Sequence, residues 1–404
     1  MNKIKMSRKE IFLLLMMLLS SCNGEKLKKE GADVGLIKID WNSISDAMDY
    51  SSLVEDSVIM FPLETTDDCL IGEVTKLICQ NNLIYIADNT SKSIFVFDMS
   101  GKLQTRVHAV GNGPGEYTNI SYFAVHGTDM ILFDHYIGKF LFYDASGKFI
   151  RDRGTGNIWT EELFCMGNKL YLPNSSKTKE GFYKLFTIDL SSDKIEKFLP
   201  VDEPKNNQGF GEVSYAQLGN EALLCFFPYY ELYTVKDEEV SLSYKVDFGD
   251  RFLSQQFIEG DGTIALRTAI RDNYVTGIER VRQSMKYLFI QFGDSENDYI
   301  SIYNKETGEM QTTKHLQNAR MGNLQLQPNG YFIIQDEQII QCYSADYWNM
   351  LGTIEYLKSS DTHFYTEGNY VTRREGNAKY PTVRVTYGRA ASNSVPLAPL
   401  DKII

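Results

Sequence analysis

The chain has 404 residues, with 25 Tyr, 23 Phe and a formal net charge of -12. So many aromatic residues favour β-strands, because flat rings pack well on a pleated surface. The negative charge repels phosphate backbones, so we expect no nucleic acid partner. Only 10 Pro and 30 Gly are present, which excludes a fibrous chain and a chain that is disordered throughout.

The first 22 residues are predicted to be an export signal. Basic residues precede an apolar run from Ile11 to Leu19, which is too short to span a bilayer as a helix. The run ends in Leu19-Ser20-Ser21-Cys22, which resembles the lipobox of bacterial lipoproteins. This resemblance implies that Cys22 becomes a lipidated N-terminus and anchors the protein in the cell envelope, at the outer membrane or the periplasmic face. A plain secretory signal with a chance cysteine is the alternative.

Residues 23–40 are predicted to be a flexible tether between the lipid and a folded domain. Five cysteines remain after Cys22, and none of them forms a CxxC pair. We therefore expect no structural zinc site and no dense disulfide framework, although one disulfide stays open in an oxidising compartment.

Two copies of one repeat, Leu83 to Leu103 and Met130 to Ile150, superpose with an offset of 46 residues. The offset places Asp88 on Asp134 and Gly101 on Gly147. A period of this length, with several short strands in each unit, is typical of a β-propeller blade. Each copy contains an Asp-x-Ser-Gly-Lys turn, in which Asp accepts backbone hydrogen bonds and Gly takes a positive φ.

We predict an all-β fold, a six-bladed β-propeller of four-stranded antiparallel blades, over residues 41–388. The strands of the first two blades are expected at Gly72–Ile78, Leu83–Ala87, Ser93–Phe97, Leu103–Val107, Ile120–Val125, Met130–Phe133, Lys139–Tyr143 and Phe149–Arg151. Weaker copies predict three further blades within Asn168–Phe198, Ala222–Val246 and Lys286–Thr313. Asn329–Gln335 begins the sixth blade, which the N-terminal strand Val58–Leu63 is expected to close by pairing with Pro381–Tyr387.

Three segments depart from the repeat. Asp250–Thr276 is expected to be an insertion of about one half-blade between the fourth and fifth blades. Asp346–Lys358 has mixed spacing and is predicted to be a short helix. Residues 389–404 are predicted to be a disordered tail.

The lipobox, the repeats ending in FD or YD plus SGK, the loop GNGPGEY at Gly111–Tyr117 and a late Pro-led strand resemble a known family. It is the family of six-bladed β-propeller lipoproteins of Bacteroides and its relatives, similar in appearance to NHL-type propellers. The resemblance is strong over Phe61–Asp152 and weaker elsewhere, since the closing strand reads Tyr-Pro-Thr-Val where the family has Asn-Pro-Val. It implies a fold and an envelope location but supplies no catalytic residue, because most members have no established activity.

Three short Gly-Glu motifs each precede an innermost-strand candidate and are one or two repeats apart. We expect Glu73, Glu116 and Glu212 to project around the mouth of the central channel, with Tyr117 beside Glu116. Such a ring would attract a cationic group or a metal ion. The alternative is that each Glu accepts hydrogen bonds from its own Gly-rich turn. No cofactor is predicted, and a metal ion in the channel is left open.

Arg271 and Tyr274, with Arg280 and Arg282, form a second candidate site. Arginine binds carboxylates or phosphates in a bidentate manner and tyrosine stacks on rings, so these residues would suit an anionic or sugar ligand. The alternative is an ordinary solvated loop.

The chain lacks the nucleophile elbow GxSxG, the phosphate loop GxxxxGK[ST] and the dinucleotide fingerprint GxGxxG. We therefore expect a monomeric binding or interaction module whose top-face loops hold a protein, glycan or small-molecule partner. The alternative is an envelope lyase or hydrolase that acts on carbohydrate or peptide at the channel mouth.

Overall fold

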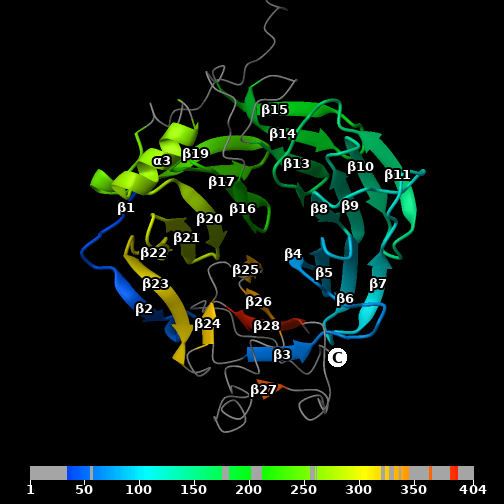
Figure 1. Cartoon of the computed structure of the whole chain (residues 1–404), viewed down its shortest axis with the longest axis horizontal. Helices are drawn as coiled ribbons and strands as arrows, with labels where there is room; N and C mark the ends of the chain where they lie inside the picture. The colour runs from blue at the N-terminus through cyan, green and yellow to red at the C-terminus, as the bar shows by residue number, and fades with distance from the viewer. Residues whose placement is uncertain are drawn as a thin grey trace, which may run out of the picture. The chain divides into compact units, whose positions relative to one another are not determined.

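The computed structural model describes residues 34–54, 58–174, 182–201, 212–254, 260, 262–319, 324–326, 332–335, 338–344, 364–365 and 383–389. Met1–Val34 and Gly35–Ile404 are separate units, and the fold given below is that of the second. Its antiparallel sheets are arranged around a central axis, as in a β-propeller (Figure 1). Cys22, the tether up to residue 33 and the predicted helix at 346–358 lie outside the described residues.

Five blades each consist of four consecutive strands that pair in sequence order. The first two blades contain β4 (Val74–Gln80), β5 (Leu83–Asp88), β6 (Ser93–Asp98), β7 (Leu103–Val107), β8 (Tyr122–His126), β9 (Asp129–Asp134), β10 (Lys139–Tyr143) and β11 (Phe149–Gly154). The third and fourth contain β12 (Phe164–Met166), β13 (Lys169–Pro173), β14 (Tyr183–Asp189), β15 (Ile195–Pro200), β16 (Val213–Leu218), β17 (Glu221–Phe226), β18 (Glu231–Lys236) and β19 (Glu239–Asp247). The fifth contains β20 (Ile278–Gln283), β21 (Tyr287–Gly293), β22 (Asp298–Asn304) and β23 (Met310–Asn318), to which β24 (Leu324–Leu326) is added.

One further sheet has a different composition. It contains β25 (Phe332–Gln335), β26 (Gln338–Ser344), β28 (Val383–Arg389), β3 (Val58–Pro62) and β27 (Phe364–Tyr365), paired in that order. The expected pairing between the early and the late strand is confirmed, since β3 lies antiparallel to β28. The sheet is not a run of four consecutive strands, because it takes strands from both ends of the folded unit and adds β27 in parallel. By the criterion of consecutive strands the structure therefore has five blades, and the predicted number of six is wrong.

The N-terminal strands β1 (Gly35–Lys38) and β2 (Ser45–Asp49) lie on outer edges of two blades. β1 pairs in parallel with β19 of the fourth blade, and β2 pairs in parallel with β23 of the fifth. Residues 35–38, expected to belong to the tether, are therefore part of the folded unit. Such strands cover exposed blade edges, whose unpaired backbone groups would otherwise attract other chains.

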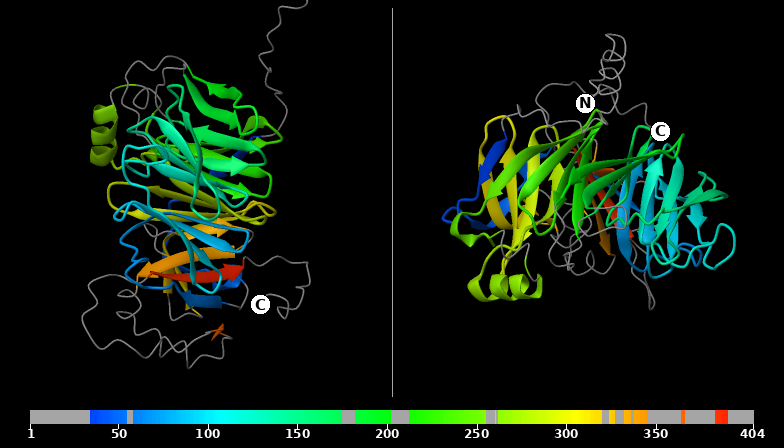
Figure 2. Two further views of the ribbon diagram at one scale, coloured as in Figure 1. Left: turned by 90° about the vertical axis from the view of Figure 1, so that its right-hand side faces the viewer. Right: turned by 90° about the horizontal axis from the view of Figure 1, so that it is seen from above.

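The insertion after the fourth blade is helical rather than half of a blade. It contains the short 3-10 helix η2 (Gly249–Arg251) and the helix α3 (Gly262–Asp272), which stands outside the sheets (Figure 2). Ala265 and Ala269 lie four residues apart on one face of α3 and pack against Leu253, whereas Ile264 and Ile270 are exposed. A second short 3-10 helix, η1 (Ser51–Leu53), follows β2.

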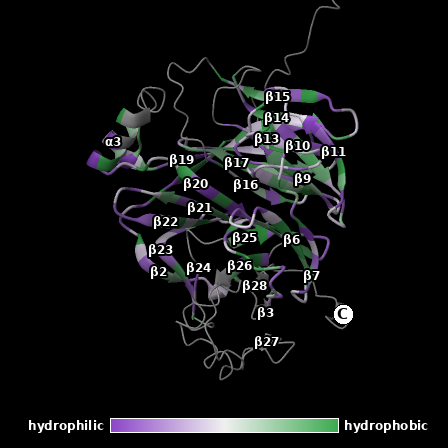
Figure 3. Cartoon of the chain, turned by 45° about the vertical axis from the view of Figure 1, so that its right-hand side comes forward, coloured by the Kyte–Doolittle hydropathy of each residue, from purple (hydrophilic) through white to green (hydrophobic). Residues whose placement is uncertain are grey.

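Apolar side chains fill the spaces between neighbouring sheets. Val96 of the first blade and Phe123 of the second share one cluster, and Phe133 and Leu172 join the second blade to the third. Another cluster joins Phe95 of the first blade to Ile340 of β26. Strands in the middle of a blade, such as β9 and β10, are accordingly apolar over much of their length (Figure 3). The five cysteines of the folded unit are free thiols.

The repeated aspartates have structural roles at two places in a blade. Asp134 is fully buried at the end of β9 and accepts hydrogen bonds from the backbone N–H groups of Thr118, Asn119 and Tyr136. It thereby fixes both the entry to β8 and the turn after β9. Asp88 binds the N–H groups of Gly72 and Glu73 in the same way.

The second repeated position lies in the Asp-x-Ser-Gly-Lys turns. Asp144 accepts hydrogen bonds from the backbone N–H groups of Ser146 and Lys148, and Asp98 does the same for its own turn. Gly147 takes a φ of +79°, and a Cβ there would lie 2.9 Å from the side chain of Thr105 in the preceding blade. Glycine is needed because this turn packs closely on its neighbour.

Replacing Asp134 with Ala is expected to lower the free energy of unfolding by about 3 kcal/mol, because several part-buried donors lose their acceptor. Asp144→Ala, in an exposed turn of the same blade, is the matched control and should have a clearly smaller effect. Urea unfolding followed by circular dichroism measures both. Equal losses would show that the buried aspartate does not fix the blade connection.

Candidate functional site

The inner strands of all six sheets line one cavity at the axis. The cavity has a volume of about 600 Å³, and its walls come from β4, β8, β12, β16, β20, β25 and the segments next to them. Cavities of this size accept small organic ligands. Polar and charged side chains contribute much of its surface, so a polar ligand is the best match.

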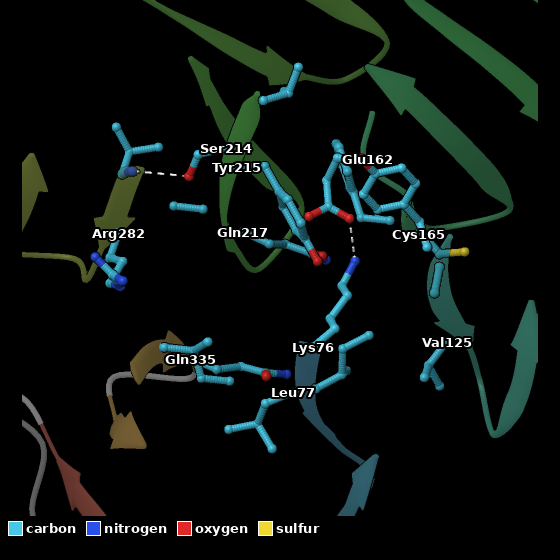
Figure 4. A pocket seen from close by; sticks show the side chains of 18 of the residues that line it. Lys76, Leu77, Val125, Glu162, Cys165, Ser214, Tyr215, Gln217, Arg282 and Gln335 are labelled. Carbon is cyan, nitrogen blue, oxygen red and sulfur yellow. Dashed lines mark hydrogen bonds and ion pairs between the residues drawn. The ribbon is translucent and has the colours of Figure 1, made fainter. Parts of the chain in front are cut away.

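Lys76 reaches from β4 across the cavity (Figure 4). Its Nζ lies 2.5 Å from Glu162 Oε1 and donates a hydrogen bond to the carbonyl oxygen of Leu163 at 2.6 Å. It also lies over the rings of Phe123 and Tyr215, at 5.7 and 5.1 Å from their centroids. One ammonium group thus contacts residues of the second, third and fourth blades.

The environment of Lys76 keeps it charged. Burial alone would lower the pKa of Lys76, but the Glu162 carboxylate and the hydrogen-bonded Tyr215 hydroxyl outweigh burial and raise it. Tyr215 stacks on Phe164, with ring centroids 4.4 Å apart, and burial raises the pKa of its hydroxyl. The Lys76 ammonium is therefore a satisfied cation and part of the cavity wall.

Two arginines line the cavity from β20. Arg280 and Arg282 are two residues apart on one strand, so their side chains share a face of the blade. Arg282 is only 7% exposed; its Nε donates to the carbonyl oxygen of Phe332 at 2.7 Å and its Nη1 to Gln291 Oε1 at 3.3 Å. Burial, and then the charge of Arg280, lower the pKa of Arg282.

Carboxylates gather where the inner strands begin. Glu162, Glu212 and Glu279 line the cavity there, together with Tyr122. Burial, and then Glu162, Glu161 and Glu212, raise the pKa of Tyr122 to about 12. Burial, and then the charges of Asp298 and Glu212, raise the pKa of Glu279. Among the described residues no group of three or more His, Cys, Asp or Glu side chains comes together as a metal site.

The predicted ring of Glu73, Glu116 and Glu212 does not form around the cavity. Only Glu212 lines it, whereas Glu73 is exposed elsewhere. Glu116 turns back on its own loop and accepts a hydrogen bond from the N–H group of Gly113 at 2.7 Å, as in the alternative given above. Tyr117 is completely buried, and its hydroxyl donates to the carbonyl oxygen of Lys92 at 2.7 Å. The loop Gly111–Tyr117 is therefore a structural connection between blades.

Arg271 and Tyr274 also lie away from the cavity. The Arg271 guanidinium pairs with Asp272 at 2.5 Å at the end of α3, and Tyr274 packs against the cluster of Leu253, Ala265 and Ala269. Because they belong to the helical insertion, they do not join Arg280 and Arg282, which enter the cavity from β20.

Comparison with known protein families shows to which family the chain belongs. The model of a domain of unknown function, DUF4934, matches residues 36–368, which is most of the chain. The chain belongs to this family. No curated protein matches it.

Two solved structures from Bacteroides are similar to this chain. A Bacteroides fragilis protein assigned as exported is 18% identical to this DUF4934 chain with a TM-score of 0.64, over 89% of this chain and 100% of that one. A member of the DUF4221 family from Bacteroides vulgatus is 14% identical with a TM-score of 0.47, over 84% and 98%. The first similarity supports the propeller fold.

The DUF4934 chain also carries an exposed aromatic group that its repeats did not predict. The rings of Tyr136 and Trp159 flank His135, with centroids 3.8 and 5.1 Å from that of His135. Tyr136 is 71% exposed and Trp159 40% exposed. Trp159 is three residues before Glu162, so this aromatic surface adjoins a segment that lines the cavity. Aromatic faces of this kind stack on the apolar faces of ring-shaped ligands.

Replacing Lys76 with Met is expected to lower the free energy of unfolding by about 3 to 5 kcal/mol, because the poorly exposed Glu162 carboxylate loses its counter-ion. The double variant Lys76→Met/Glu162→Gln should recover most of this loss, since no unpaired charge remains. A double-mutant cycle by urea unfolding measures the coupling. A double variant as unstable as the single one would show that the ion pair does not account for the effect.

Proposed function

We propose that this protein is a binding protein of the cell envelope that holds a small polar ligand in its central cavity. The observation that carries this proposal is the cavity of about 600 Å³, lined by charged side chains from the inner strands. Tyr122, Phe164 and Tyr215 line the same cavity and support a ligand with a ring, such as a sugar. The proposed site is thus the cavity rather than the top-face loops.

The ionisable groups of the cavity favour binding over catalysis. Burial raises the pKa of the Cys165 thiol to about 12, and the pKa values of Tyr122 and Lys76 are raised as well. At neutral pH these groups keep their protons, so they are poor nucleophiles and bases. Glu279 is the exception, because its raised pKa would suit a general acid. A lyase or hydrolase that uses Glu279 is therefore the second candidate.

The envelope location and the lipid anchor on Cys22 are part of the proposal. They are supported by the apolar run and lipobox-like sequence at the N-terminus and by the exported Bacteroides fragilis protein of similar fold. Among the described residues no helix is long and apolar enough to cross a membrane. The NHL-like character of the propeller, and a monomer that meets its ligand at the cell surface or in the periplasm, are further parts of the proposal.

Filling the cavity tests the proposed function. Gln217 lines the cavity and its side-chain amide bonds only weakly, at 3.3 Å, to the carbonyl oxygen of Gly219, so Gln217→Trp should occupy ligand space without opening the core. Gln311→Trp, on the exposed face of the outer strand β23, is the matched control. Native mass spectrometry of protein isolated from its own cells should show a small-molecule adduct in the control and not in Gln217→Trp. Finding the adduct in both variants, or in neither, contradicts a ligand in the cavity.

A further inference from the structure

We propose that Arg280 and Arg282 form an anion subsite in the cavity and that the ligand carries an oxyanion, such as the carboxylate of an acidic sugar. This inference rests on the proposed function, because it names the chemistry of the same ligand. Nothing else described above requires two arginines at this place.

The first step is that the Arg282 guanidinium is incompletely bonded. A guanidinium has five N–H donors, and two of them are used on the carbonyl oxygen of Phe332 and on Gln291. The other three have no acceptor among the residues that the structure describes. The Phe332 ring lies 3.6 Å from the guanidinium and covers one of its faces. The free donors therefore remain for a group within the cavity.

The second step is the charge. Within the described part of the chain no carboxylate forms an ion pair with Arg282, although the side chain is more than nine-tenths buried. Burying an unpaired cation is costly, so buried arginines normally have an anionic partner. Lys76 in the same cavity shows the usual arrangement, with Glu162 and the Leu163 carbonyl bound to one ammonium. Arg282 has no equivalent of Glu162 among the residues that the structure describes.

The third step is Arg280. It places a second positive charge on the same face of β20, two residues from Arg282, and after burial this charge further lowers the pKa of Arg282. Its guanidinium forms no ion pair or hydrogen bond within the described residues, although the neighbouring Glu279 lies within electrostatic range. Two like charges side by side are unfavourable alone but bind an oxyanion well, because each offers a planar pair of donors.

The location of the pair supports a ligand rather than a structural ion. In Figure 4, Arg282 lies across the open space from Glu162 and Cys165, so a ligand between them would meet a cationic wall on one side. Glu212 and Glu279 lie at the starts of neighbouring inner strands. A molecule with one anionic group and several hydroxyl groups matches this mixed lining, whereas a free inorganic anion would use only the arginines.

Isothermal titration calorimetry with glucuronate and glucose tests the subsite, since the two sugars differ in a carboxylate. The purified wild-type protein should bind glucuronate at least tenfold more tightly than glucose. Arg280→Gln and Arg282→Met should each remove this preference. Arg153→Gln is the control and should keep the preference for glucuronate, because Arg153 lies on the outer strand β11 and pairs there with Asp193. Equal binding of the two sugars in the wild type, or a preference unchanged in both cavity variants, overturns the proposal.

Thermal unfolding without ligand separates a binding role from a structural one. Arg282→Met removes a buried charge that has no ion-pair partner among the described residues, but it also removes the hydrogen bonds to Phe332 and Gln291, so its melting temperature should fall less than that of Lys76→Met, which breaks an ion pair. A decrease as large as that of Lys76→Met would show that Arg282 is paired within the protein, which overturns the subsite. Inorganic sulfate at constant ionic strength provides a third arm. If sulfate raises the melting temperature of the wild type but not that of Arg280→Gln, an oxyanion site is supported. If sulfate raises both melting temperatures equally, the oxyanion site is contradicted.

The outcomes also separate this inference from the proposed function. A cavity adduct that persists in Arg280→Gln and Arg282→Met, and disappears in Gln217→Trp, retains the binding function and excludes the anion subsite. Absence of any adduct in the wild type removes the proposed function itself, whichever sugars bind in the calorimeter.

Discussion

The Lys76–Glu162 ion pair connects blades that are not neighbours in the ring. Apolar clusters hold each blade to the next one, but such contacts cannot reach across the axis. The Lys76 side chain does so, because it extends from the first blade to the segment before β12 of the third. Both charges are poorly exposed, at 13% and 17%, so each depends on the other. One ion pair therefore links the first blade to the third across the cavity.

The same constraint distinguishes the two kinds of cation at the axis. A charge on an inner strand cannot reach bulk water easily, so it must find a partner within the fold or in a bound molecule. Lys76 forms an ion pair with Glu162, whereas Arg282 has only neutral acceptors among the described residues. This difference, rather than the number of charges, makes the β20 side of the cavity the place to look for a ligand.

The parts of the fold that depend on local sequence could be predicted. Strands of the first two blades were placed correctly to within a few residues, because their turns carry Asp and Gly at fixed positions. The inner strand β20 was missed, since its sequence Ile-Glu-Arg-Val-Arg-Gln has the charges of a solvated loop. The spacing of Arg280 and Arg282 was the available signal of a strand, because residues two apart share one face. That this face lines the central cavity becomes evident only in the folded structure. The pairing of the early strand with the late strand was predicted, but the last sheet also includes β27 and has no run of four consecutive strands, so the blade count failed.

Of the predicted site residues only Glu212, Arg280 and Arg282 line the cavity, and the others lie outside it for a related reason. Glu116 and Tyr117 stand out in the sequence because their loop repeats, yet repeated residues usually serve the architecture that repeats. In the structure they bond to Gly113 and Lys92. Lys76 has no lysine counterpart in the next blade, because Tyr122 stands 46 residues later at the same position and lines the cavity there. Departures from the repeat were therefore better guides to the cavity than the repeat itself.

The parallel edge strands have a consequence for how the protein is made. β1 and β2 are synthesised before any blade, yet their partners β19 and β23 belong to the fourth and fifth blades. β3 likewise pairs with β28, which is synthesised close to the end of the chain. During synthesis the first folded residues to emerge are thus among the last to find their places, and the first three blades must form without them. Pairings between such distant segments are slow to form, which leaves the early strands exposed to chaperones or to other chains in the meantime.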